Sequence, residues 1–224
     1  EEAKAFVEAV SLNLKYAGVC DCRMEEGSLR VDVNISLMPE GATELGTRAE
    51  IKNLNSLKSI ARAIEYEIYR QSELLDNGMN IIQETRRFDD NSGTTSSLRS
   101  KQEVHDYRYF PEPDIPAVIF TQDDIENIRS NLPKMPQERF EEYTVVFGLP
   151  EDDARLLISD KALSDFYNGA VSVYPNYKGI ANLILVELLH LLNKSGLSMD
   201  SLLIPPQDIA KLVRLTDEGK VSRN

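Results

Sequence analysis

Hydrophobic and polar residues alternate strictly along residues 29–37, and the same period of two returns at residues 47–51. Successive side chains of a strand point to opposite faces of its sheet, so both segments are predicted to be strands with one buried face. The residues Pro39–Gly41 supply turn chemistry between them. If the two strands pair antiparallel, both polar rows lie on the same face of the sheet.

That polar face is predicted to carry the carboxylates Asp32 and Glu50, the cations Arg48 and Lys52, and the amide Asn34. Two interpretations remain open. The face is simply hydrated, as most polar strand faces are, or its carboxylates hold a hard cation while its cations face phosphate. Magnesium sites typically use only one or two carboxylates, completed by water and substrate phosphates. The pattern alone does not choose between these interpretations.

Hydrophobic residues at helical spacing predict a helix over residues 2–17 and a second over residues 56–77. Asn55 or Ser56 is expected to cap the second helix, and Gly78 fits its end. A hairpin is predicted next, with one strand reaching Phe88 and another ending near Arg99. The apolar stripe of the second helix is predicted to comprise Leu57, Ile60, Ala61, Ile64, Ile68 and Leu75.

After Thr121 the period of two disappears, and only helices are expected. The segment 179–194 is apolar nearly all round, which predicts a buried core helix with His190 as a satisfied core histidine rather than a ligand. The predicted class is therefore α+β, with a sheet-and-helix body to about residue 120 followed by an all-helical one. The further helices are expected near 136–147, 151–158, 160–170, 179–194 and 206–218.

The amino-acid composition excludes several classes of protein. The formal net charge of −12 over 224 residues excludes a free-standing basic nucleic-acid binder, so any such contact must rest on local patches. Cys20 and Cys22 are too close for easy bridging and have no second pair for zinc, which favours a reduced intracellular protein. No hydrophobic run is long enough to span a membrane, and no signal peptide opens the chain. The start is already amphipathic helix without an initiator Met, which suggests a fragment.

The usual phosphate-binding glycine motifs and the G-x-S-x-G nucleophile motif are absent. Several short segments are instead dense in polar side chains. They are MEEGSLR (24–30), EIKNLNS (50–56), QETRRFD (83–89), LRSK (98–101) and DYRYFPEPD (106–114). In this order they resemble the B subunit of the glutamyl/aspartyl-tRNA amidotransferase family, GatCAB, over essentially the whole chain.

The resemblance implies a division into three parts. Residues 1–120 would be the later part of a kinase-like cradle domain with an antiparallel sheet, 121–205 a helical domain, and 206–224 the start of a YqeY-like tail. Such a protein uses ATP and Mg²⁺ to phosphorylate the side-chain carboxyl of Glu-tRNA(Gln) or Asp-tRNA(Asn). Its expected partners are the A subunit, an amidase that releases ammonia from glutamine, the small C subunit and the misacylated tRNA. The expected location is the bacterial cytoplasm, or an organellar matrix in a eukaryote.

The resemblance also assigns residues. Asp32 and Glu50 are expected metal carboxylates, with Glu25 and Glu26 as further candidates. Family metal ligands that belong to the N-terminal half, including a histidine motif, are absent, and His105 and His190 do not replace them. The chain alone is therefore expected to be inactive. The expected active-site rim comprises Lys52, Asn53, Asn55 and Ser56, and the expected nucleotide contacts are Arg48, Arg87 and Arg99.

Alternatives remain for several of these residues. Glu25 and Glu26 fit a solvated turn equally well, and Asn53 and Asn55 fit helix capping. Arg86 and Arg87 point to opposite faces of their strand, so at most one of them shares a site. Arg108 fits a structural stacking pair between its neighbouring tyrosines as well as a substrate contact.

At the level of function, two other roles stay open. The chain could serve mainly as a tRNA-binding and subunit-docking module, or as an α+β domain whose polar strand face is only hydrated. The tRNA contacts of the docking module would rest on a few cations, namely Lys211, Arg214, Lys220 and Arg223.

Overall fold

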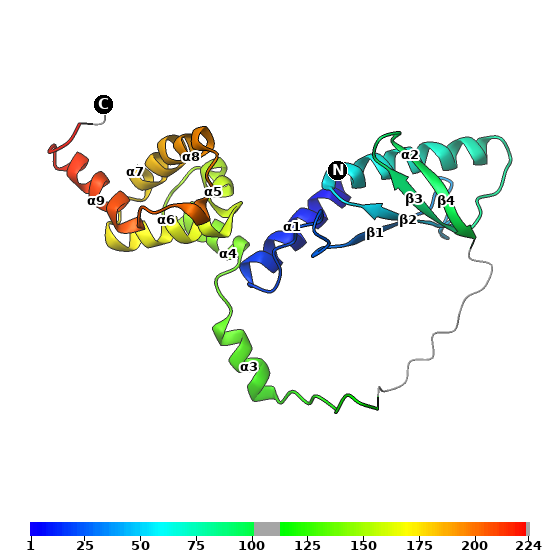
Figure 1. Ribbon diagram of the computed structural model, residues 1–224, viewed down its shortest axis with the longest axis horizontal. Coiled ribbons are helices and arrows are strands. Elements are labelled where there is room, and N and C mark those ends of the chain that lie inside the picture. Colours follow the sequence, from blue (N-terminus) through cyan, green and yellow to red (C-terminus); the bar gives the residue numbers. More distant parts are fainter. Residues whose placement is uncertain (101–112, 223–224) are drawn as a thin grey trace. The chain divides into compact units, whose positions relative to one another are not determined.

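The computed structural model describes residues 1–100 and 113–222, without the side chains of residues 99 and 100 (Figure 1). The chain forms two compact units. The sheet unit comprises Glu1–Ser11 and Cys20–Ser130, and the helical unit comprises Leu12–Val19 and Asn131–Asn224. His105, residues 107–110 with their predicted stacking, and Arg223 lie outside the described residues. No helix in the described ranges is long and apolar enough to cross a membrane.

The α+β class is confirmed by a four-stranded sheet and many helices. The strands lie in the order β1-β2-β3-β4 (Figure 1). The elements of the sheet unit are β1 (Val31–Ile35), β2 (Ala49–Leu54), α2 (Leu57–Asp76), β3 (Glu84–Asp89), β4 (Thr94–Ser100) and α3 (Gln122–Asn131). Helix α1 (Glu2–Tyr16) is divided between the two units.

The sheet is mixed rather than antiparallel throughout. Strands β1 and β2 pair antiparallel as predicted, and β3 and β4 form the predicted antiparallel hairpin. Strands β2 and β3 run parallel. Helix α2 follows β2 and precedes β3 in the chain. It brings the chain back to the end of the sheet where β2 begins, so that β3 can run parallel to β2.

Local sequence explains where α2 begins and ends. The backbone N–H of Ser59 donates to Ser56 Oγ over 3.0 Å, so Ser56 is the cap. Gly78 follows the helix with a φ of +70°, a conformation that a glycine adopts without strain. The predicted limits of this helix are thereby confirmed.

The buried face of α2 differs from the predicted apolar stripe, because Ile68 and Leu75 are exposed while Glu67 and Gln71 are fully buried. The Glu67 carboxylate accepts hydrogen bonds from Gln71 Nε2 at 3.0 Å and from Thr95 Oγ1 at 3.1 Å. It also forms ion pairs with Arg70 and Arg86. Because these hydrogen bonds and ion pairs satisfy the Glu67 carboxylate, Glu67 can occupy a core position where a hydrophobic side chain would be expected. The spacing of apolar residues does not reveal such a position.

Helices α1 and α2 contribute to the apolar layer on one face of the sheet. Figure 1 shows α2 extending along that face. The opposite face of β1 and β2 carries the polar residues. The buried members of the apolar layer are Val7, Ile51, Leu54, Ile60, Ala63 and Phe88.

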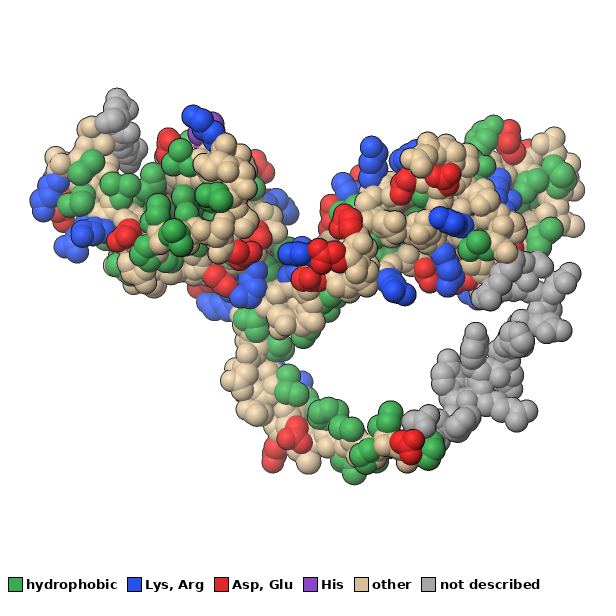
Figure 2. Space-filling view, in the orientation of Figure 1, with side chains coloured by type: hydrophobic (Ala, Val, Ile, Leu, Met, Phe, Trp, Pro, Cys, Tyr) green, Lys and Arg blue, Asp and Glu red, His purple; other side chains and the backbone are tan. Residues whose placement is uncertain are grey.

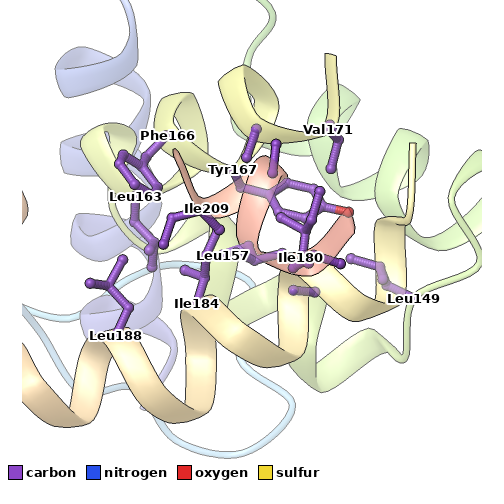
Figure 3. Packing of buried hydrophobic residues seen from close by; sticks show 14 of the residues in the cluster. Leu149, Leu157, Leu163, Phe166, Tyr167, Val171, Ile180, Ile184, Leu188 and Ile209 are labelled. Carbon is purple, nitrogen blue, oxygen red and sulfur yellow. The ribbon is translucent and has the colours of Figure 1, made fainter. Parts of the chain in front are cut away.

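The helical unit is built from short helices at the predicted places. Its elements are α4 (Pro136–Glu141), the π-helical turn η1 (Glu142–Val146), α5 (Glu151–Ile158), α6 (Lys161–Val173), α7 (Tyr177–Asn182), the π-helical turn η2 (Leu183–Leu188), α8 (Leu189–Ser195), the 3-10 turn η3 (Met199–Ser201) and α9 (Pro206–Asp217). Leu163, Ile184 and Ile209 come from different helices and meet in one core (Figure 3). Helix α9 is therefore part of this core.

The predicted helix 179–194 is continuous through α7, η2 and α8, but it is not buried all round. Ile184 and Leu188 lie in the core, whereas Val186 and Leu191 are exposed. His190 is also not buried in the core: its side chain lies on the solvent side of α8, so the prediction of a core histidine is wrong. In a unit this small a helix has core on one side only, whatever its composition.

The end of α1 packs within the helical unit through Tyr16, which is fully buried. Its hydroxyl donates to the backbone oxygen of Ile158 over 2.9 Å. The guanidinium of Arg139 lies 5.0 Å from the centre of the Tyr16 ring, within the range of a cation–π contact. Through these contacts residues 12–19 form part of the helical unit.

Ile184→Ala is expected to destabilise the helical unit by about 2–5 kcal/mol, because it removes buried methyl groups and leaves a cavity. Val186→Ala, two residues away on the exposed side, is the matched control and should change the free energy of unfolding by less than about 0.5 kcal/mol. Urea unfolding of both variants measures the difference. Equal effects would contradict the one-sided core.

Candidate functional site

The polar face of β1 and β2 brings Asp32, Glu50 and Lys52 together. Lys52 Nζ lies 3.3 Å from Asp32 Oδ2 and 3.4 Å from Glu50 Oε1. The expectation that both carboxylates share one face of two antiparallel strands is confirmed. The side chains of Asp32 and Lys52 are 48% and 41% exposed, whereas that of Glu50 is 16% exposed. The cluster is thus open to solvent at one end and more enclosed at the other.

A β-bulge determines where Lys52 points. At Asp32 the register shifts, so that one residue of β1 faces two residues of β2, Lys52 and Asn53. Asn53 has a φ of +69°, in the left-handed region that asparagine enters more readily than most residues. Its side-chain amide donates to the backbone oxygen of Phe88 over 3.2 Å. The bulge is therefore fixed to β3.

Strand β3 extends the polar face. Thr85 Oγ1 donates to Glu50 Oε2 over 2.8 Å, and Arg87 is the neighbour of Lys52 in the parallel register. Arg86 points to the α2 side, where it is buried beside Glu67, so only Arg87 of the two arginines belongs to this face. The sequence did not reveal the role of Thr85, because the parallel pairing of β2 and β3 has no local signal.

The other predicted site residues have varied surroundings. Arg48 and Asn55 are exposed just before β2 and α2, and Ser56 caps α2. Glu25 and Glu26 are exposed in the loop before β1, where Glu26 forms an ion pair of 2.9 Å with Arg23. The backbone of Arg99 pairs with Thr85, but its side chain lies outside the described residues. The functional roles of all these residues stay predictions.

The two carboxylates of the cluster stabilise the charged form of Lys52. The hydrogen bond and charge of Asp32, followed by the charge of Glu50, raise the pKa of Lys52 above its ordinary value. Within the described ranges no group of three or more His, Cys, Asp or Glu side chains forms a complete metal cage. Asp32 and Glu50, which flank the ammonium group of Lys52, are the two carboxylates that could hold a metal ion. Their number suits Mg²⁺, which takes one or two carboxylates and completes its shell with water and phosphate.

The face of each unit displayed in Figure 2 shows no large patch of one charge sign among the described residues. Figure 2 shows acidic and basic side chains interspersed over the displayed face of each unit. Of the cations predicted to contact tRNA, Lys211 is exposed, and Arg214 and Lys220 both pair with Glu218, at 3.0 and 2.6 Å. Their contact with nucleic acid stays a prediction.

Asp32→Asn is expected to lower the pKa of Lys52 towards its ordinary value, because the substitution removes the largest cause of the upward shift. NMR titration of the Lys52 side chain measures this change. Asp124→Asn, which removes a carboxylate from the start of α3, is the control and should leave the Lys52 titration where it was. An unchanged titration in Asp32→Asn would show that the ion pair does not persist in solution.

The chain is similar in sequence to known proteins over its whole length. Residues 1–126 match the family model described as the GatB/GatE catalytic domain, and residues 165–224 match the GatB domain. The chain is 54% identical over its whole length to the B subunit of the aspartyl/glutamyl-tRNA(Asn/Gln) amidotransferase of Ruminiclostridium cellulolyticum. It is 46% identical over 99% of its length to the protein of the same name from Carboxydothermus hydrogenoformans.

The chain spans just under half the length of these relatives, 46% in both cases. The polar face with Asp32, Glu50, Lys52 and Thr85 lies within the segment matched by the catalytic-domain model. The match to that model covers more than half of the chain. The chain therefore belongs to the GatB family.

Proposed function

We propose that the polar face of the sheet unit is part of a site that activates the side-chain carboxyl of Glu-tRNA(Gln) or Asp-tRNA(Asn) by ATP-dependent phosphorylation. The observation that carries the proposal is the continuous row of contacts from Asp32 through Lys52 and Glu50 to Thr85, across three strands. The names of the relatives, which specify both tRNA classes, support the choice of substrate.

In this proposal each residue has a distinct task. Asp32 and Glu50 would hold Mg²⁺, and Thr85 orients the Glu50 carboxylate by its hydrogen bond. Bound Mg²⁺ would neutralise charge on the phosphates of ATP. Lys52 and Arg87 are neighbours on the same face and supply positive charge to phosphate oxygens. Positioning and electrostatic stabilisation are the main contributions a protein makes to phosphoryl transfer.

The remaining assignments extend this site at its edges. Arg48 and Arg99 are proposed nucleotide contacts, and Asn53, Asn55 and Ser56 are proposed to form the rim. Glu25 and Glu26 are proposed to supply further carboxylates from the loop before β1. The amidase subunit would deliver the ammonia that displaces the phosphate, with the small C subunit as a third component.

A second candidate role is docking to the amidase subunit. Helix α3 has no buried residue, and its side chains Ile125 and Ile128 are exposed. Figure 2 shows hydrophobic side chains along the segment that carries this helix. An apolar helix face without a partner within the described residues favours an interaction with another surface.

The two roles are separated by Asp32→Ala and Glu50→Ala in the complete amidotransferase complex. Each change is expected to lower tRNA-dependent ATP hydrolysis and amidation by about 100-fold or more, because it removes a carboxylate that positions the cation. Glutamine hydrolysis, which occurs on the amidase subunit, should persist at least in part. Assays of ATP hydrolysis and glutamine hydrolysis in the same preparation show whether the first is lost while the second persists.

Glu40→Ala, in the exposed turn after β1, is the matched control and should leave both reactions near the wild-type rate. ATP hydrolysis and amidation near the wild-type rate in both site variants would show that the polar face is only hydrated. The docking role would then be the better account of the chain.

A further inference from the structure

The ammonium of Lys52 already occupies the place between the two carboxylates where a cation would be held. It is within 3.4 Å of oxygens from both Asp32 and Glu50, which come from different strands. A lysine ammonium is a compact point charge, so it fills such a place electrostatically in the way a metal ion does. Lys52 and a divalent cation would therefore compete for the same two carboxylates.

This arrangement follows from the backbone. The bulge at Lys52 and Asn53 places both residues opposite Asp32, and the left-handed conformation of Asn53 is maintained by its hydrogen bond to β3. Backbone conformations of this kind are retained where the surrounding structure enforces them, and they cluster at functional positions. The position of Lys52 is thus built into the sheet.

Glu50 is held more firmly than Lys52. One oxygen of Glu50 accepts the hydrogen bond of the buried Thr85, while the other faces Lys52. Lys52 has a flexible four-carbon stem and a side chain that is 41% exposed. The lysine can therefore leave while Glu50 stays oriented, because a partly exposed ion pair is weak enough for another cation to displace it.

We propose that Lys52 is a built-in competitor of Mg²⁺, which occupies the carboxylates of Asp32 and Glu50 until the metal ion displaces it. The inference rests on the proposed function, because it takes these carboxylates as the magnesium site. It adds that Lys52 weakens binding of the free metal ion. The displaced ammonium is then available to an anionic group, so metal binding and phosphate binding are coupled through one side chain.

The test is calorimetric titration of the full chain with MgCl₂. Lys52→Met removes the charge but keeps a side chain of similar length, and it is expected to bind Mg²⁺ about tenfold more tightly than the wild type. A tenfold gain corresponds to about 1.4 kcal/mol, which is of the order expected for removing a unit charge beside two carboxylates that are partly exposed to water. Circular dichroism and thermal unfolding confirm that the variants are folded.

Two further variants separate competition from general charge effects. Lys52→Arg keeps the cation and should bind Mg²⁺ as weakly as the wild type. Lys58→Met makes the same loss of charge at an exposed lysine in the first turn of α2 and should change the affinity by less than about twofold. An equal gain in Lys52→Met and Lys58→Met would overturn the inference.

The outcome also separates this inference from the proposed function. In the double variant Asp32→Asn/Glu50→Gln, loss of Mg²⁺ binding is expected and supports the metal site itself. If that loss occurs but Lys52→Met binds no more tightly than the wild type, the competition is overturned and the site stands. If Lys52→Met shows no Mg²⁺ binding at all, both the competition and the metal site are overturned.

Discussion

The buried carboxylate of Glu67 joins helix α2 to the sheet, and the arrangement of the sheet unit depends on it. A charge removed from water is strongly destabilising unless it is paired and hydrogen-bonded. Glu67 meets this requirement with Arg70 on its own helix, Arg86 on β3 and Thr95 on β4. These partners come from separate elements, so α2 fits the sheet in one register.

Fixing α2 on one face of the sheet determines what the other face can do. The helix connects β2 to β3 and makes them parallel neighbours, which places Thr85 beside Glu50 and Arg87 beside Lys52. In an antiparallel arrangement of the same strands these pairs would not form. The order of polar groups across the open face is therefore a consequence of the crossover and of the bulge at Asn53.

The sequence predicted those features that depend on local patterns. Alternation placed Asp32 and Glu50 on one face, and capping chemistry placed the start of α2 at Asn55 or Ser56, of which Ser56 is the cap. Prediction from the sequence failed where contacts between distant segments determine which residues are buried. The burial of Glu67 requires partners from β3 and β4, and the exposure of His190 reflects which side of its helix the core occupies. Neither feature has a signature within a few residues of the chain.

The two faces of the sheet carry ion pairs of opposite character. On the α2 side, Glu67 and Arg86 are enclosed, and removing either one would leave the other buried with fewer partners, which is destabilising. On the open side, Lys52 is shared between two carboxylates and half exposed to water, where ion pairs contribute little to stability. Weak pairs exchange partners readily. The proposed binding and release of a cation and a polyanion would use such exchangeable groups, carried by a sheet that the buried cluster joins to α2.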